Sequence, residues 1–94
     1  MNTSAENDVV LGGDETHYWK LACENFRKIC TLHKEGHIRV AEDLTRGRLS
    51  WLIARWSEAS RLSPAEKRLK LINMFDEEGR RAGESDIARR LFSA

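Results

Sequence analysis

The residues that interrupt helices are few in this chain and widely spaced, and this spacing constrains the fold more than any other feature. Glycine occurs at positions 12, 13, 36, 47, 79 and 83, and the single proline is Pro64. Between these positions apolar residues recur at steps of three and four, and no run alternates apolar and polar residues over the length of a strand. The sequence therefore predicts an all-α fold, a small bundle of three to four helices with a long second helix.

The length and the charge distribution predict one domain with an acidic tail. The chain has 94 residues, of which 40% are hydrophobic and 33% charged, as in an ordinary globular domain. The formal net charge is +1, but residues 1–15 carry four acidic side chains and no basic one. We expect residues 1–13 to form a flexible tail and residues 14–94 a single helical domain. No secretory signal and no membrane-spanning apolar run are recognisable, so we expect a cytoplasmic protein of bacterial type.

Three of the four expected helices have recognisable ends. The first begins with Asp14 as its N-cap and stops at Gly36. The third begins at the capping box of residues 63–66 and runs past Gly79 to near Gly83, and the last follows a Ser85 cap. The apolar stripe of the first helix comprises Trp19, Ala22, Cys23, Phe26, Ile29, Cys30 and His33.

The second segment, residues 37–60, carries more apolar surface than one face of a helix needs. Two apolar lines follow it at different angles around the axis, and Gly47 either lies within one helix or divides it into two, with Thr45 as a cap. Trp51 and Trp56 are five residues apart, which places them about 140° apart on a helix. At least one of the two tryptophans is therefore expected outside a simple two-layer core.

The cysteines and histidines raise the question of a metal site. Cys30 and His33 are three residues apart, and His37 follows four residues later, all ligand types that zinc accepts. Cys23 and Cys30 lie on an apolar stripe, where a free cysteine packs as a small hydrophobe, and no Cys-x-x-Cys pair occurs. We expect no metal and no cofactor, and metal binding by Cys30, His33 and His37 stays an open question. A Cys23–Cys30 disulfide is excluded on a straight helix, because seven residues rise about 10 Å.

Catalysis has little support in the sequence. The three histidines have no nucleophile in a recognisable motif beside them, and Gly12-Gly13 lacks the Lys-Ser/Thr of a phosphate-binding loop. We expect no catalytic residues and no enzymatic activity.

Nucleic-acid binding is the alternative function. Eleven arginines outnumber five lysines, and Arg46, Arg48, Arg55, Arg80 and Arg81 are the candidates for phosphate contacts. Residues 62–93, which begin with the capped segment 62–68 and end with 85–93, resemble the first two helices of the DNA-binding domain of LuxR-type regulators, over about a third of the chain. The resemblance implies a helix-turn-helix, but the chain ends at Ala94, where the recognition helix that reads bases would begin.

The surplus of apolar helix faces favours a protein that binds another protein. Tryptophan and arginine are enriched where interfaces gain most of their energy, and residues 51–56 contain both. We expect a homodimer that inhibits a partner, such as a transcription regulator, by covering its dimerisation or functional surface. The residues predicted to form the partner or dimer interface are Val40, Leu44, Leu49, Trp51, Leu52, Arg55 and Trp56.

Overall fold

The computed structural model describes the backbone of residues 3–92 and the side chains of residues 14–92. Its helices are α1 (Thr3–Lys34), α2 (Ile38–Leu44), α3 (Ser50–Ala59), α4 (Pro64–Arg81) and α5 (Ile87–Phe92). A π-helical turn, η1 (Thr45–Leu49), joins α2 to α3. None of residues 3–92 lies in a strand, so the predicted all-α fold is confirmed. No helix in this part of the chain is long and apolar enough to cross a membrane.

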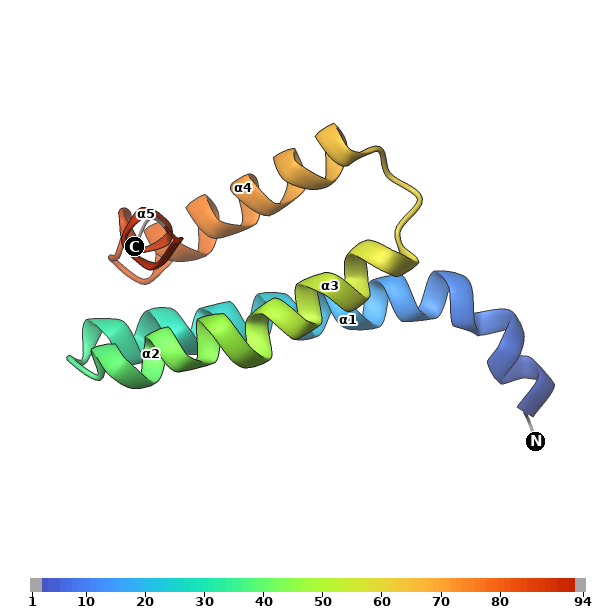
Figure 1. Cartoon of the computed structure of the whole chain (residues 1–94), viewed down its shortest axis with the longest axis horizontal. Coiled ribbons are helices and arrows are strands. Elements are labelled where there is room, and N and C mark those ends of the chain that lie inside the picture. The colour runs from blue at the N-terminus through green and yellow to red at the C-terminus, as the bar shows by residue number, and fades with distance from the viewer. Residues whose placement is uncertain (1–2, 93–94) are drawn as a thin grey trace.

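Helix α1 is central to the arrangement (Figure 1). Elements α2, η1 and α3 follow one another without a break and return antiparallel to α1, and we call residues 38–59 the α2–α3 rod. Helix α4 lies along the other side of α1, and the short α5 folds back at the end of α4. The main contacts of α4 are with α1 and α5, so the rod and α4 are held together through α1.

The C-terminal end of α1 agrees with the prediction, and its N-terminal end does not. The helix ends at Lys34, and Gly36 follows with a φ of +93°, a conformation that glycine adopts without strain. The expected start at Asp14 is wrong, because the helix begins at Thr3 and runs through Gly12 and Gly13. A glycine in a helix costs about 1 kcal/mol relative to alanine, which weakens a helix without ending it. The flexibility of residues 1–13 stays a prediction, since their side chains are outside the described residues.

The α2–α3 rod settles whether Gly47 divides the second segment. It does not: Gly47 lies inside the π turn, where the Ser50 amide donates to the Thr45 carbonyl five residues earlier. Thr45 does not cap a new helix, because its hydroxyl donates back to the Ala41 carbonyl at 2.8 Å. Ala41 and Leu49 are both buried although eight residues separate them. Two regular turns take about seven residues, so the π turn accommodates the additional one.

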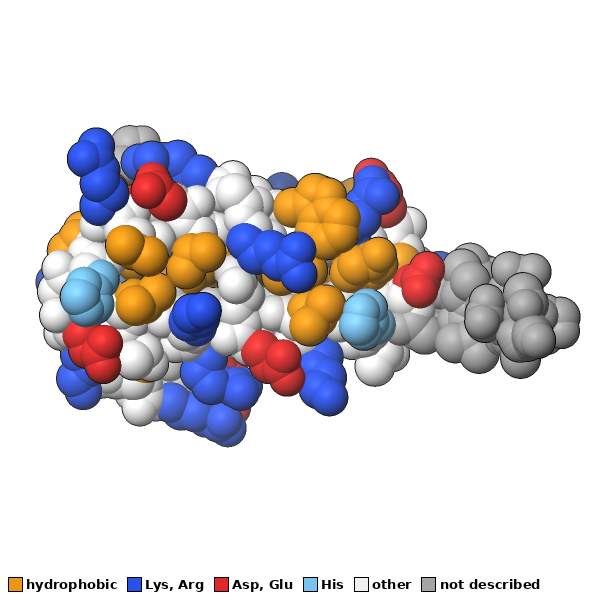
Figure 2. Space-filling model, turned by 90° about the horizontal axis from the view of Figure 1, so that it is seen from below, with side chains coloured by type: hydrophobic (Ala, Val, Ile, Leu, Met, Phe, Trp, Pro, Cys, Tyr) orange, Lys and Arg blue, Asp and Glu red, His pale blue; other side chains and the backbone are white. Residues whose placement is uncertain are grey.

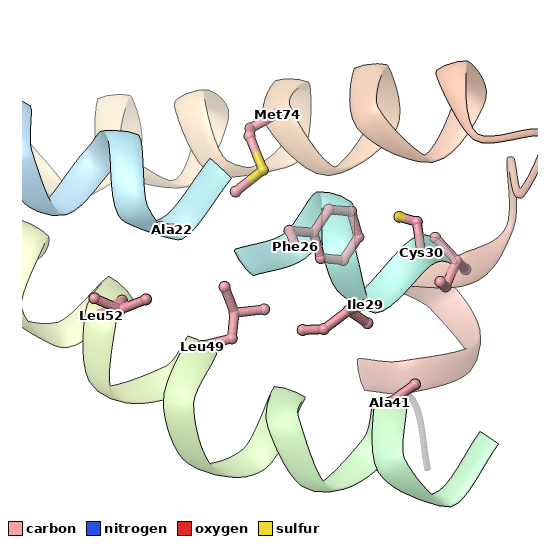
Figure 3. Packing of buried hydrophobic residues seen from close by; sticks show 9 residues of the cluster. Ala22, Phe26, Ile29, Cys30, Ala41, Leu49, Leu52 and Met74 are labelled. Atoms are coloured by element: carbon pink, nitrogen blue, oxygen red, sulfur yellow. The ribbon is translucent and has the colours of Figure 1, made fainter. Parts of the chain in front are cut away.

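The core lies where the α2–α3 rod and α4 meet opposite sides of α1 (Figure 3). Leu49 and Leu52 of the rod point toward Phe26 and Ile29 of α1, while Met74 reaches the same cluster from α4. The aromatic rings extend this contact, since Phe26 packs against Phe75 of α4 with 4.8 Å between ring centroids. The buried part of the apolar stripe predicted for α1 comprises Ala22, Phe26, Ile29 and Cys30.

Helix α4 begins and ends as its sequence predicts. Ser63 and Glu66 form the capping box, with each side chain accepting a hydrogen bond from the other residue's backbone amide. Near its end, Gly79 is buried beneath the turn that leads into α5. A β-carbon on Gly79 would lie 2.8 Å from the Glu84 carbonyl oxygen and 3.1 Å from Ile87. Helix α5 itself begins at Ile87, two residues after the expected Ser85 cap.

We expect Gly79→Ala to lower the free energy of unfolding by about 1–3 kcal/mol, because the added methyl group forces the turn before α5 away from α4. Gly47→Ala is the matched control: a β-carbon there meets nothing within 4 Å, so it should raise stability by about 0.5–1 kcal/mol. Urea unfolding followed by circular dichroism measures both. Equal stability of the two variants would show that the turn is not packed as described.

Candidate functional site

The seven residues predicted to form an interface fall on two sides of the α2–α3 rod. Leu49, Leu52 and Trp56 are buried in the core of this chain, with at most 1% of each side chain exposed. Val40 and Trp51 are each 48% exposed, while Leu44 and Arg55 are partly exposed. The first three therefore hold the fold together, and Leu44 packs against the edge of the same core. Val40, Trp51 and Arg55 remain accessible on the surface.

The two tryptophans of α3 confirm the geometry expected from their spacing. Trp56 is fully buried and packs against Trp19 of α1, with 4.7 Å between ring centroids. Lys70 of α4 places its ammonium group 4.6 Å from the Trp19 ring centroid and so covers this pair. Trp51 faces another direction and keeps about half of its surface in contact with solvent.

Trp51 is held by three neighbouring side chains. The guanidinium carbon of Arg48 lies 5.3 Å from the Trp51 ring centroid, and that of Arg55 lies 6.0 Å away. Tyr18 of α1 meets the same ring edge-on, with 5.9 Å between centroids. We call Tyr18, Arg48, Trp51 and Arg55 the Trp51 surface. Its large side chains are fixed by cation–π and aromatic contacts before any partner binds.

The face of the molecule opposite α4 carries exposed hydrophobic side chains (Figure 2). Hydrophobic side chains gather there in two groups along α1 and the α2–α3 rod, with basic side chains between and around them. Ile38 and Val40 of α2 are also exposed, at 41% and 48%. An apolar strip bordered by charged groups is typical of a surface that binds another protein.

Sequence reasoning missed two members of the Trp51 surface. Arg48 was assigned only to phosphate contacts, although its position three residues before Trp51 places both on one helix face. Tyr18 is more than thirty residues from Trp51 and reaches it because α1 and α3 lie side by side. The spacing of Arg48 from Trp51 was a signal in the sequence that could have predicted this contact. The contact of Tyr18 with Trp51 could not be predicted without knowing how α1 and α3 pack.

The candidate metal ligands have other partners. Burial raises the pKa of the Cys30 thiol to about 11, with the Glu78 carboxylate as the second cause, so this group stays a thiol at neutral pH. His33 places its Nδ1 atom 2.8 Å from a Glu84 carboxylate oxygen, whereas His37 is exposed. Within the described part of the chain, no three His, Cys, Asp or Glu residues are grouped to hold a metal ion. Both cysteines are free thiols.

One ion pair joins α4 to α1. The Arg27 guanidinium donates two hydrogen bonds to the Glu78 carboxylate, each 2.9 Å long. Glu78 is nearly buried, and the bonds from Arg27 hold the pKa of its carboxyl below the ordinary value of 4.5 against the opposing effect of burial. This pair lines an open pocket of about 470 Å³ with Arg81, whose own carboxylate partner is Glu77 at 2.8 Å.

Comparison of the chain with protein-family models, with curated proteins and with solved structures gave no match. The resemblance of residues 62–93 to LuxR-type regulators therefore stays a prediction.

We expect Glu78→Gln to destabilise the protein at neutral pH, because the charged form of Glu78 is the form that Arg27 binds. A lowered carboxyl pKa contributes stability above the ordinary value of 4.5, and this contribution is lost as the pH falls through the lowered pKa. The stability difference between the wild type and Glu78→Gln should therefore shrink on acidification. Urea unfolding at a series of pH values measures it.

Glu77→Gln is the control for this experiment, because it removes an exposed pair between neighbouring turns that contributes about 0.2–0.5 kcal/mol. A stability loss from Glu78→Gln that is the same at every pH would contradict the assigned role of the Arg27 pair.

Proposed function

We propose that this chain is a non-enzymatic binding module that acts by covering a surface of another protein, with the Trp51 surface as its contact. The observation that carries this proposal is the Trp51 ring, half exposed and held between Arg48, Arg55 and Tyr18. Tryptophan, tyrosine and arginine are the residues at which interfaces gain most of their binding energy.

The separation of this surface from the core supports the proposal. Trp51 projects away from the buried residues of the same helix, Leu52 and Trp56, so a partner can cover its ring without disturbing the core. The contacts with Arg48 and Tyr18 already restrict the side chain, which reduces the entropy lost when a partner binds. Exposed side chains whose freedom is already restricted are more typical of a binding surface than of a purely structural one.

The mode of action that fits a small helical module is inhibition by occlusion. Such a module prevents assembly of its partner by occupying the partner's dimerisation or functional surface, and a transcription regulator is a suitable partner. A homodimer also stays part of this proposal. Its contact would lie elsewhere than on the buried side of the α2–α3 rod, because α1 already fills that side.

Binding of nucleic acid is the competing function, and the ion pairs of the candidate arginines count against it. Arg80 and Arg81 lie 3.0 and 2.8 Å from carboxylates one turn earlier. Arg46 lies within 4.0 Å of two carboxylates, and Arg55 pairs with Glu58. Of the five candidates only Arg48 lacks a carboxylate this close among the described residues. Salt-sensitive retardation of duplex DNA in a gel would favour the competing function.

We expect Trp51→Ala to weaken partner binding by at least about 30-fold, which corresponds to about 2 kcal/mol for an interfacial tryptophan. The partner is first isolated by affinity capture from the native host, identified, and then titrated with purified protein. Circular dichroism should show that the variant remains folded, since Trp51 lies outside the core.

Phe92→Ala is the matched control, because Phe92 is an aromatic residue with the same exposed fraction of 48% and lies on α5. It should bind the partner as the wild type does. If the Phe92 and Trp51 variants lose affinity equally, or if neither loses any, the Trp51 surface is not the contact.

A further inference from the structure

We infer that the partner inserts a carboxylate side chain into a pocket beside the Trp51 surface, between α1 and the α2–α3 rod. This inference rests on the proposed function and specifies the chemistry of the partner. The pocket is open and has a volume of about 190 Å³. Its lining, which we call the Asn25 pocket, consists of Leu21, Glu24, Asn25, Lys28, Arg48 and Leu52.

Two cations of this pocket are not neutralised by the protein. Within the described residues no carboxylate oxygen lies within 4.0 Å of the Lys28 ammonium or the Arg48 guanidinium. The cations of two pockets between α1 and α4 differ, because Arg27 and Arg81 pair with carboxylates and the Lys70 ammonium lies over an aromatic ring. Lys28 and Arg48 together therefore offer an anion two charge-assisted hydrogen-bond donors in one place.

Asn25 adds a neutral donor to the lining of this pocket. Its side-chain oxygen is buried, so the amide nitrogen is the polar atom of Asn25 that is left to face the pocket. An amide nitrogen donates hydrogen bonds and therefore needs an acceptor there. A carboxylate in contact with Lys28 and Arg48 supplies that acceptor.

Arg48 connects the pocket to the Trp51 surface. The flat face of a guanidinium stacks on an aromatic ring while its N–H edge stays free to bind a carboxylate. Arg48 lies over Trp51 at 5.3 Å and also lines the Asn25 pocket, so it takes part in both contacts. It belongs to the π turn η1, a type of helix irregularity that is frequent at functional sites.

The pocket suits a protein carboxylate better than the phosphates of a nucleic acid. Its lining holds two cations, Lys28 and Arg48, and one carboxylate, Glu24, so the remaining positive charge matches a single carboxylate. A continuous phosphate backbone carries more negative charge and would also meet Glu58, which pairs with the neighbouring Arg55. Leu21 and Leu52 form apolar walls, and Trp51 adjoins them through Arg48. A partner segment with an Asp or Glu one helical turn from a large apolar residue can place its carboxylate against the two cations and its apolar side chain against the apolar walls. The partner segment is therefore an amphipathic helix with acidic residues beside its apolar stripe.

The test is a titration of the full chain with sodium acetate, followed by NMR signals of the Asn25 side-chain amide and the Arg48 Nε–H group. We expect saturable shifts with acetate and none with sodium chloride at the same ionic strength. The double variant Lys28→Gln and Arg48→Gln should weaken acetate binding by at least about tenfold, since it removes both charge-assisted donors. Both side chains are exposed, so the fold should be kept.

Trp51→Ala separates this inference from the proposed function, because it should weaken partner binding by at least about 30-fold and change acetate binding far less than the double variant does, since Lys28 and Arg48 both remain. Absence of acetate shifts, or equal shifts with chloride, would overturn the carboxylate site while a loss of partner binding in Trp51→Ala would still support the proposed function. Retardation of duplex DNA that disappears in Arg48→Gln would also overturn it, since the pocket would then bind phosphate. Acetate binding with unchanged partner affinity in Trp51→Ala would instead refute the proposed function.

Discussion

The packing of α1 on two sides is the constraint on which the rest of the structure depends. The α2–α3 rod and α4 are held in place mainly through their separate contacts with α1. Phe26 shows how one residue serves both sides, because it lies in the cluster with Leu49 of the rod and packs against Phe75 of α4. A helix that is covered on two sides needs a wide apolar stripe, which explains why the stripe of α1 extends over so many residues.

This arrangement leaves the outer side of each partner helix uncovered. On the rod the outer side carries Val40 and Trp51, and on α4 it carries Leu69 and Ile72, which are 59% and 53% exposed. Further helices packed against these outer sides would cover such surfaces in a larger bundle. The sequence therefore contains more apolar residues than its core buries, because the one central helix covers only one side of the rod and one side of α4.

Local signals in the sequence predicted the helices that depend on local interactions. The capping box at Ser63 and the stop at Gly36 involve residues within one or two turns of each other, and both are present. The start at Asp14 was wrong because Gly12-Gly13 was taken as the end of a tail that precedes the helix, whereas the helix runs through both glycines. The π turn and the contact of Tyr18 with Trp51 were not predictable, since both depend on how α1 and the rod pack. The division of the predicted interface into buried and exposed residues was likewise not predictable, because it too depends on how α1 and the rod pack.

The π turn is also the place where the α2–α3 rod can lose one residue and keep its buried side against α1. Because η1 adds one residue to the two turns between Ala41 and Leu49, loss of a single residue between Thr45 and Leu49 would leave an ordinary α-helix with Ala41 and Leu49 still facing α1. A deletion elsewhere in the rod would turn its buried side away from the core. The helix would thus survive the shorter segment, and with residue 46 or 47 removed Arg48 would still precede Trp51 by three residues and share its helix face. The extra residue is therefore dispensable for the helix and for the contact between Arg48 and Trp51.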